Sequence, residues 1–290
     1  MKKENIINTL LENPQKIYLI AEIGINHNGD MRIAKKLIDA AHSCGWDSVK
    51  FQKRNPDVCV PDDQKKIKRD TPWGEMTYLD YKKRIEFEKT EYDEIDSYCQ
   101  DKEIDWTVSV WDIDSLDFIL KYDVPYLKIP SAHLTNLSLI EETARSGKPL
   151  IISTGMSNWK MIDEAVSIIE KQNCDYAMLH CNSTYPAPLD ELNLNVILEM
   201  KERYDCLIGY SGHEYGLVPS QMAAVLGAQI IERHITLDHT MWGTDQSASI
   251  EISAMDLLKK RLKDMNLMMG TREKFITETE KEVEKKLRIK

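Results

Sequence analysis

The stretch KIYLIAEIGINHNGD, residues 16–30, decides between two classes of fold. Its first part, residues 16–24, is a near-continuous apolar run, which is typical of a parallel strand buried on both faces. The turn that follows, GINHNGD at 24–30, lacks the G-x-G-x-x-G spacing that opens a doubly wound dinucleotide-binding sheet. The stretch therefore favours a closed parallel barrel over an open sheet.

Further runs of the same kind recur along the chain, with helical segments between them. The segment 31–45, for example, places Ile33, Leu37, Ala40 and Ala41 on one helical face. Together with 16–24, the strand candidates are residues 47–52, 105–111, 125–130, 149–155, 176–181, 206–211 and 229–235. Eight strand–helix units in about 270 residues predict an α/β fold, the (β/α)8 TIM barrel.

Two regions fall outside this repeat. We expect a single barrel domain over residues 1–290, with a long polar insertion at about 53–89 and a charged C-terminal helix at about 271–290. An insertion of this length is usually a lid or a substrate wall, and Trp73, Tyr78 and Tyr81 lie in it. The mixed charges of the tail favour a solvated surface helix.

Composition narrows the class of protein. A formal net charge of −10 argues against a general binder of nucleic acid or membrane surfaces. The six cysteines are scattered without a C-x-x-C pair, which indicates reduced thiols and a cytoplasmic location. No signal peptide is recognisable, and no apolar run approaches the ~20 residues of a membrane span.

Polar side chains follow every predicted strand. In a (β/α)8 barrel the carboxyl ends of the strands meet at one face, where the chemistry takes place. Two lysines with several serines predict an anion site, and a phosphate suits it best because it offers many acceptor oxygens. Two histidines on adjacent strands can share a metal ion. Glu22 could be a third ligand or a base.

Several motifs resemble the sialic acid synthase family (N-acetylneuraminate synthase and its relatives) over about residues 16–255. They are IAEIGINHNGD (20–30), VKFQ (49–52), KIPS (128–131), STGMS (153–157), LHCNSTYPAP (179–188), IGYSGHEYG (208–216) and IERHITLD (231–238). The resemblance implies a (β/α)8 barrel. It also implies a transferase that condenses phosphoenolpyruvate (PEP) with an open-chain sugar aldehyde, giving a 2-keto-3-deoxy sugar acid and phosphate.

The resemblance also implies roles for individual residues. The catalytic group comprises Glu22, Lys50, Lys128, His213 and His234. The PEP-binding positions are Lys50, Ser109, Lys128, Ser131, Ser153, Ser183 and Ser211. The sugar-binding positions are Gln52, His133, Tyr185, Asp245 and Gln246. His213 and His234 match metal ligands, and we expect a divalent ion, with Mn²⁺ favoured over Mg²⁺ or Co²⁺.

The sequence also departs from the family pattern, mainly on the sugar side. His133 stands where the family usually has a glutamate, Trp242 and Gln246 change another motif, and VSVWD (108–112) keeps only the hydroxyl of Ser109. We expect the family's small C-terminal antifreeze-like domain to be absent. The positions that bind PEP thus match the family pattern. Because the sugar side differs, we do not expect N-acetylmannosamine to be the acceptor.

Two alternatives remain beside this interpretation. A PEP-aldose phosphate synthase of the octulosonate or heptulosonate type would need an additional arginine cluster, and only Arg54, Arg69 and Arg84 could supply it. A non-catalytic sugar-binding barrel is disfavoured because both lysines and both histidines are retained. We expect small-molecule partners only, with neither nucleic acid nor membrane, and a homodimer stays open.

Overall fold

The strands form one closed parallel barrel. The computed structural model describes residues 5–289, so residues 1–4 and 290 of the expected domain and tail lie outside it. The barrel consists of β1 (Tyr18–Gly24), β2 (Ser48–Lys53), β5 (Asp105–Val110), β6 (Leu127–Ile129), β7 (Leu150–Ser153), β8 (Tyr176–His180), β9 (Leu207–Gly212) and β10 (Ile230–Thr236). The barrel closes because β1 pairs with β10, from Tyr18 opposite Ile230 to Glu22 opposite His234. The predicted (β/α)8 barrel is confirmed.

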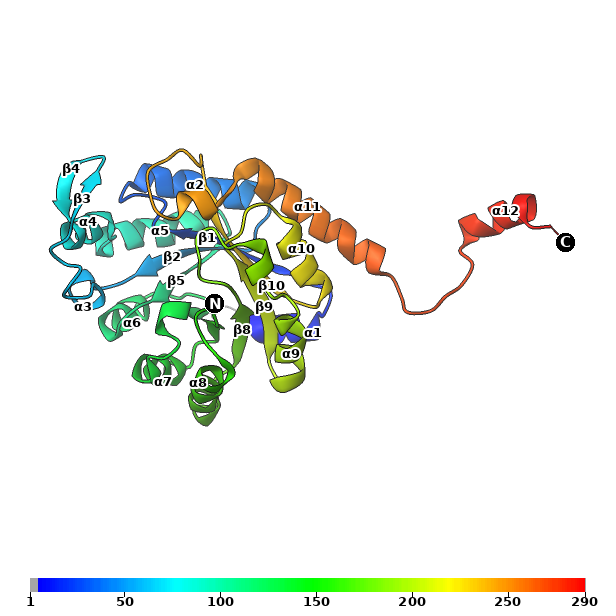
Figure 1. Cartoon of the computed structure of the whole chain (residues 1–290), viewed down its shortest axis with the longest axis horizontal. Coiled ribbons are helices and arrows are strands. Elements are labelled where there is room, and N and C mark those ends of the chain that lie inside the picture. Colours follow the sequence, from blue (N-terminus) through cyan, green and yellow to red (C-terminus); the bar gives the residue numbers. More distant parts are fainter. Residues whose placement is uncertain (1–4, 290) are drawn as a thin grey trace.

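Helices surround the barrel and bury their apolar faces against it (Figure 1). They are α2 (Met31–Ser43), α5 (Lys89–Asp101), α6 (Ile113–Ile119), α7 (Leu137–Arg145), α8 (Trp159–Lys171), α9 (Val196–Arg203), α10 (Val218–Val225) and α11 (Ile252–Met269). Their starts follow ordinary capping chemistry: Asp30 accepts from the amide of Arg32 at α2, and Asn158 from that of Met161 at α8. Short 3-10 turns occupy Ser131–His133, Leu189–Glu191 and Gln246–Ala248, and the short strand β11 (Ile250–Glu251) pairs in parallel with the end of β10.

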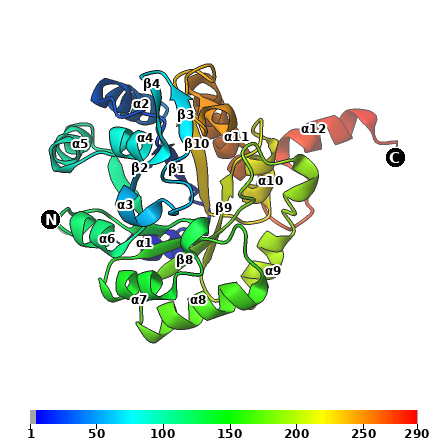
Figure 2. The same cartoon turned by 60° about the vertical axis from the view of Figure 1, so that its left-hand side comes forward.

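Helix α1 (Ile6–Glu12) covers the end of the barrel at which the strands begin (Figure 2). Ile6, Ile7 and Leu10 pack there against a separate apolar cluster that includes Tyr18 and Ile230. The polar side chains at the carboxyl ends of the strands lie at the opposite end of the barrel, because all the strands are parallel. One end of the barrel therefore contributes to stability, and the other carries the candidate active site.

The predicted insertion is a folded unit rather than an open loop. It contains α3 (Pro56–Cys59), an antiparallel hairpin of β3 (Lys68–Thr71) and β4 (Gly74–Thr77), and α4 (Tyr78–Ile85). Its aromatic side chains pack against the loop that follows β10: the ring centroids of Trp73 and Tyr81 lie 5.9 Å and 5.2 Å from that of Trp242. The insertion is thus fixed beside the mouth of the barrel.

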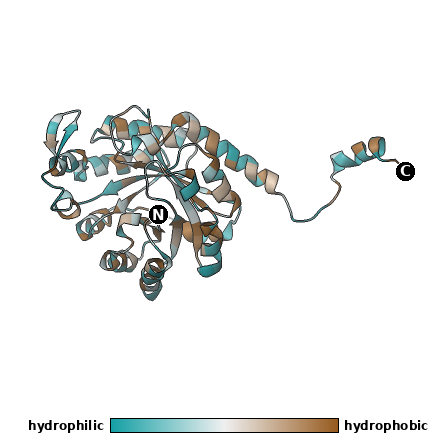
Figure 3. Cartoon of the chain, in the orientation of Figure 1, coloured by the Kyte–Doolittle hydropathy of each residue, from teal (hydrophilic) through white to brown (hydrophobic). Residues whose placement is uncertain are grey.

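The charged tail forms α12 (Glu278–Leu287), which projects away from the barrel (Figure 1). Most of its residues are hydrophilic (Figure 3). Val283 and Leu287 on α12 are exposed. No helix among the described residues is both long and apolar enough to cross a membrane.

Candidate active site

The carboxyl ends of the strands enclose a cavity of about 190 Å³. Twelve of the predicted residues line it: Glu22, Lys50, Gln52, Ser109, Lys128, Ser131, Ser153, Ser183, Tyr185, Ser211, His213 and His234. Glu232, Trp111, Pro130, Ala132 and Met156 complete the lining. Seven successive strands contribute to it through their last residues or the first residues of the following loop, and β10 completes the ring, as a parallel barrel requires.

Four buried charged side chains form the floor of the cavity: Glu22, Lys50, Lys128 and Glu232. The ammonium of Lys50 is ion-paired with Glu22, lies 3.7 Å from a carboxylate oxygen of Glu232, and donates to the Ser109 hydroxyl at 2.8 Å. Burial opposes the charge of Lys50, but the two carboxylates outweigh it and raise the pKa of this lysine. Burial raises the pKa of Glu22 despite the attraction of Lys50. In this part of the floor the Lys50 ammonium is therefore held between the carboxylates of Glu22 and Glu232.

Lys128 supplies a second ammonium on the neighbouring strand β6. Its Nζ donates to the Ser153 hydroxyl at 2.5 Å and to the Ile129 carbonyl at 3.3 Å. Burial lowers the pKa of Lys128, and Glu232 offsets only part of that effect. Burial also favours neutral Glu232, but Lys128 and Lys50 lower its pKa to about 2. A bound anion would therefore stabilise the charge of Lys128, which has no ion pair among the described residues.

Small residues let the loops converge on this cavity. A Cβ at Gly155 would overlap the hydroxyl of Ser183 and approach the hydroxyl of Ser131 to 2.9 Å. The amide of Gly155 donates to the Ser131 hydroxyl at 3.1 Å. The absence of a side chain at this position is thus what allows the loops after β6, β7 and β8 to present hydroxyls to one point.

The predicted metal ligands lie side by side on β9 and β10. The rings of His213 and His234 are 5.5 Å apart, and His213 Nδ1 lies 2.6 Å from the Asn182 carbonyl. Burial, and then the neighbouring His234, lower the pKa of His213 to about 3, so that ring is neutral. His234 Nδ1 is buried without a hydrogen-bond partner among the described residues. A neutral imidazole oriented by a carbonyl, as at His213, suits a divalent metal ion.

The donor set for such an ion is small. Among the described residues, no three His, Cys, Asp or Glu side chains gather closely enough to enclose a metal. Glu22 is instead paired with Lys50, which favours a role near the reacting atoms over that of a third ligand. The hydroxyl of Tyr185 lies 3.0 Å from His213 Nε2, at the position a metal would take. Two imidazoles fit an ion that keeps open positions for water and substrate oxygen.

Three predicted sugar-binding residues do not line this cavity. His133 is half-buried, with its ring 5.0 Å from that of Trp111. Burial, and then the charge of Asp245, raise the pKa of the Tyr185 phenol. The Gln246 amide is used internally, since it accepts from Thr236 at 2.5 Å and donates to the Asn26 carbonyl at 3.2 Å. Gln246 thus ties β10 to the loop after β1 and does not reach the cavity.

Glu232 is the main site residue that the sequence analysis did not assign. The sequence places the Glu232 carboxylate at the end of an apolar strand, but only the fold shows that it lies between Lys50 and Lys128. Arg233 and Glu214 form a second unassigned group behind the site. Both are fully buried, and Arg233 Nη1 lies 3.0 Å from Glu214 Oε1.

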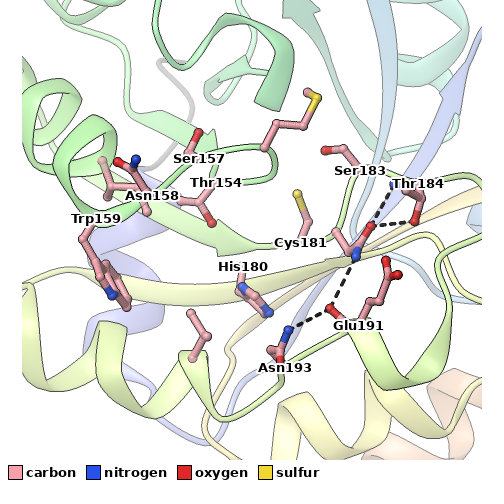
Figure 4. Close-up of a pocket in the computed structure, with 14 residues that line it drawn as sticks. Thr154, Ser157, Asn158, Trp159, His180, Cys181, Ser183, Thr184, Glu191 and Asn193 are labelled. Atoms are coloured by element: carbon pink, nitrogen blue, oxygen red, sulfur yellow. Dashed lines mark hydrogen bonds between the residues drawn. The ribbon is translucent and has the colours of Figure 1, made fainter.

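A larger cavity of about 650 Å³ adjoins the site between the loops after β7 and β8. Figure 4 shows its polar lining, which includes Thr184 and Glu191. Asn182 accepts from Thr184 and donates to the Glu191 carbonyl. It shares Met156 and Ser183 with the smaller cavity but contains no lysine or arginine. The smaller cavity is therefore the better candidate for binding an anion.

Comparisons with known proteins agree with this geometry. The NeuB family profile matches residues 37–274. The chain is 36% identical to the N-acetylneuraminate-9-phosphate synthase of Mus musculus, covering 93% of this chain and 76% of the relative. It is 34% identical to the N,N'-diacetyllegionaminic acid synthase of Campylobacter jejuni, covering 88% and 78% of the two chains.

A solved structure shows the same likeness. The N-acetylneuraminic acid (sialic acid) synthetase of Leptospira borgpetersenii, in complex with citrate, superimposes with a TM-score of 0.84 at 30% identity, covering 96% of this chain and 94% of the other. This match and the NeuB profile both span most of the chain, and the strand-end cavity contains residues from every motif that resembles this family. The chain belongs to the NeuB family.

Proposed function

We propose that the strand-end cavity condenses PEP with the open-chain aldehyde of a sugar, giving a 2-keto-3-deoxy sugar acid and phosphate. The observation that carries this proposal is the floor of Lys50 and Lys128, surrounded by the hydroxyls of Ser109 and Ser153. Cations and hydroxyl donors that converge at this density suit a small molecule carrying a phosphate and a carboxylate. The relatives of this chain include an N-acetylneuraminate-9-phosphate synthase and an N,N'-diacetyllegionaminic acid synthase, which supports the proposal.

The reaction can be assigned to groups of the chain. Lys50 and Lys128 hold the two anionic groups of PEP and orient its methylene carbon toward the aldehyde. A carbon–carbon bond forms between these atoms, the aldehyde oxygen takes a proton, and water adds to the former enol carbon. The carbon–oxygen bond to phosphate then breaks and phosphate leaves. Glu22, whose pKa is raised by burial, lies beside these atoms and is suited to exchange the proton.

A divalent ion, Mn²⁺ in preference to Mg²⁺ or Co²⁺, would be held by His213 and His234 and would supply Lewis-acid polarisation of the aldehyde oxygen. The neutral state of His213 and its hydrogen bond to the Asn182 carbonyl support this assignment. Tyr185 would then give up its contact with His213 and bind a substrate hydroxyl. Gln52, which donates to Glu22 at 3.3 Å, lies at the same level of the cavity.

The test is consumption of PEP by the purified chain with Mn²⁺, screened over N-acetylmannosamine, its 6-phosphate, other amino sugars, hexoses and pentoses. We expect one of these aldoses to give equimolar loss of PEP and formation of a 2-keto acid. A Lys50→Met variant should lose both signals. If no aldose consumes PEP while PEP itself binds at Lys50 and Lys128, the site binds PEP without this condensation and the proposal is wrong.

We also propose a cytoplasmic location and self-association into a homodimer. The six cysteines, all within the described residues, form no disulfide, which supports a reducing compartment. Exposed Val283 and Leu287 on the projecting helix α12 support association with a second copy. Light scattering of the full chain and of a Val283→Lys, Leu287→Lys variant tests this, since a monomer in both would contradict it.

A further inference from the structure

A buried group of polar side chains lies behind the two histidines, on the outer side of the barrel wall. Successive side chains of a strand point to opposite faces, so His234 on β10 faces the cavity while Arg233 before it faces the helices. Tyr210 on β9 packs in the apolar cluster that the helices share with the barrel. Together with Glu214 and Ser220, these two side chains form what we call the outer network, and all four are fully buried.

The Arg233 guanidinium is the centre of the outer network. Its Nη1 donates to the Glu214 carboxylate at 3.0 Å, to the Gly216 carbonyl at 2.8 Å and to the Ser220 hydroxyl at 3.1 Å. Its Nη2 donates to the Glu214 carbonyl at 2.6 Å. Four hydrogen bonds from one planar group therefore fix the loop after β9 and the start of α10 against β10.

The Glu214 carboxylate is held from a second side by Tyr210, whose hydroxyl donates to it at 2.8 Å. Burial, and then the charge of Glu214, raise the pKa of Tyr210, so the phenol keeps its proton. A Cβ at Gly212 would lie 2.7 Å from one oxygen of this carboxylate and 2.9 Å from the other. Because Gly212 lies opposite Arg233 in the sheet, its missing side chain leaves room for the ion pair.

The outer network is joined through the backbone to both candidate metal ligands. Glu214 directly follows His213, and Arg233 directly precedes His234. The His213 ring is also held at Nδ1 by the Asn182 carbonyl, whereas His234 Nδ1 has no hydrogen-bond partner among the described residues. The placement of the His234 ring therefore depends on the strand that carries it, and Arg233 ties that strand to the loop after β9.

Stability alone does not account for an ion pair in this position. Charges that leave water cost free energy, and apolar side chains of similar volume are often as stable as a buried pair. A pair with several directed hydrogen bonds instead supplies one defined geometry. Two imidazoles that share an ion need such a geometry, because a nitrogen of each ring must approach the ion to about 2 Å.

We propose that the outer network positions the His213 and His234 rings relative to each other, at the separation that one divalent ion requires. This inference rests on the proposed function in one respect, namely that these two rings bind the ion. Arg233, Glu214 and Tyr210 are then positioning residues, since none of them lines the cavity. Loss of the network should leave both ligands in the chain and lower their affinity for the metal.

The decisive variant removes both charges of the buried pair. Arg233→Met combined with Glu214→Leu replaces them with apolar side chains, so the double variant should resist urea better than Arg233→Met alone. Mn²⁺ titration followed by electron paramagnetic resonance gives the Kd of each folded protein. We expect the double variant to bind Mn²⁺ at least ~10-fold more weakly than the wild type, the scale for loss of a group that orients a metal ligand. Recovery of both stability and Mn²⁺ affinity would show a purely structural pair and overturn the proposal.

Tyr210→Phe is the milder companion, because it removes one hydrogen bond and no charge. We expect a smaller loss of Mn²⁺ affinity in the same direction, with an unchanged circular dichroism spectrum. Arg203→Met is the control, since Arg203 pairs with Asp163 at the surface, and its Kd for Mn²⁺ should equal that of the wild type. A wild-type Kd in both Tyr210→Phe and the double variant would also contradict a positioning role.

A measurement without metal separates this proposal from the proposed function. NMR of isotope-labelled histidine side chains reports both rings, whose signals are identified by their loss in His213→Ala and His234→Ala. We expect these signals to move in Tyr210→Phe and in the double variant, while those of the exposed His42 stay in place. If they move but the wild type binds no Mn²⁺, the network positions the rings and the metal assignment is wrong. If the wild type binds Mn²⁺ but neither signals nor Kd change in the variants, the metal assignment stands and the network has no positioning role.

Discussion

The floor and the mouth of the cavity treat buried charge in opposite ways. On the floor, Lys50 is ion-paired with Glu22 and lies near Glu232, which interacts with Lys128 in turn. At the mouth, Lys82 has no carboxylate within ion-pair distance among the described residues, and one nitrogen of Arg54 lacks an acceptor. Lys50 on the floor is thus paired before any ligand arrives, whereas Lys82 at the mouth has no ion pair among the described residues.

This difference matches the tasks of the two regions. A pre-organised floor holds reacting atoms in a fixed geometry without reorganisation during the reaction. Incomplete donors at the mouth instead favour the ligand that completes them and disfavour a ligand that leaves them unpaired. We therefore expect floor substitutions to affect turnover with every acceptor, and mouth substitutions to change the ranking of acceptors.

The largest expected effect comes from the histidine pair. His213→Ala or His234→Ala should reduce kcat by roughly 10³-fold or more, because metal polarisation contributes several kcal/mol to such reactions. Circular dichroism should show an intact fold, since neither ring belongs to the apolar core. Mn²⁺ binding, followed by electron paramagnetic resonance, should weaken in parallel. Full activity of either variant in the presence of a chelator would exclude a metal role for this pair.

A second large effect concerns the backbone that carries both histidines. Arg233 precedes His234, Glu214 follows His213, and Arg233 also donates to the Gly216 carbonyl at 2.8 Å. Arg233→Met leaves the buried Glu214 carboxylate unpaired, so we expect about 3–5 kcal/mol lower stability in urea unfolding.

Arg203→Met is the control for Arg233, because Arg203 pairs with Asp163 at the surface. A surface pair of this kind contributes about 0–1 kcal/mol. Equal losses of stability in the two variants would show that the Arg233–Glu214 pair does not lock β9 to β10.

Lys128→Met tests whether the floor of the cavity binds the anionic groups of PEP. Its ammonium donates to Ser153 but has no ion pair among the described residues, so a ligand anion is its natural partner. We expect PEP affinity measured by calorimetry to fall by about 2 kcal/mol or more, the scale of a charge-assisted hydrogen bond. The exposed Lys160→Met serves as control. An unchanged PEP affinity in both Lys128→Met and Lys50→Met would place the phosphate site elsewhere.

The barrel and its floor could be predicted from the sequence because both follow from local patterns. Each strand is a short apolar run, and each run delivers its polar residue to the same end. Position in the sequence alone therefore predicts that four residues lie at this end of the barrel: Glu22, Lys50, Lys128 and His234. The packing of α1 against the opposite end of the barrel follows from long-range apolar contacts that no local pattern contains.

The mouth could not be predicted in the same way. In the sequence, Arg54 is one of three arginines of the insertion, and Lys82 is one lysine among its many charged residues. No local pattern distinguishes either from its neighbours. Only the folded hairpin and α4 show that Lys82 is buried beside Tyr81 while Lys83 faces solvent. Gln246 was assigned to the sugar, but its amide is used by Thr236 and Asn26.

The smallest expected effect is at His133, whose ring lies 5.0 Å from that of Trp111 in the cavity wall. Burial lowers the pKa of His133, so the ring is neutral at pH 7 and cannot replace an acceptor-only carboxylate. We therefore expect plain N-acetylmannosamine to be a poor acceptor. His133→Glu restores an acceptor-only carboxylate beside Trp111 and should raise kcat/KM for N-acetylmannosamine relative to the other aldoses by roughly fivefold, as expected for a partly solvated charge of about 1 kcal/mol. His133→Gln, which adds no charge, should leave the ratio unchanged. If N-acetylmannosamine is the best substrate of the native chain, or if His133→Glu leaves the order of acceptors unchanged, His133 has no part in choosing the sugar.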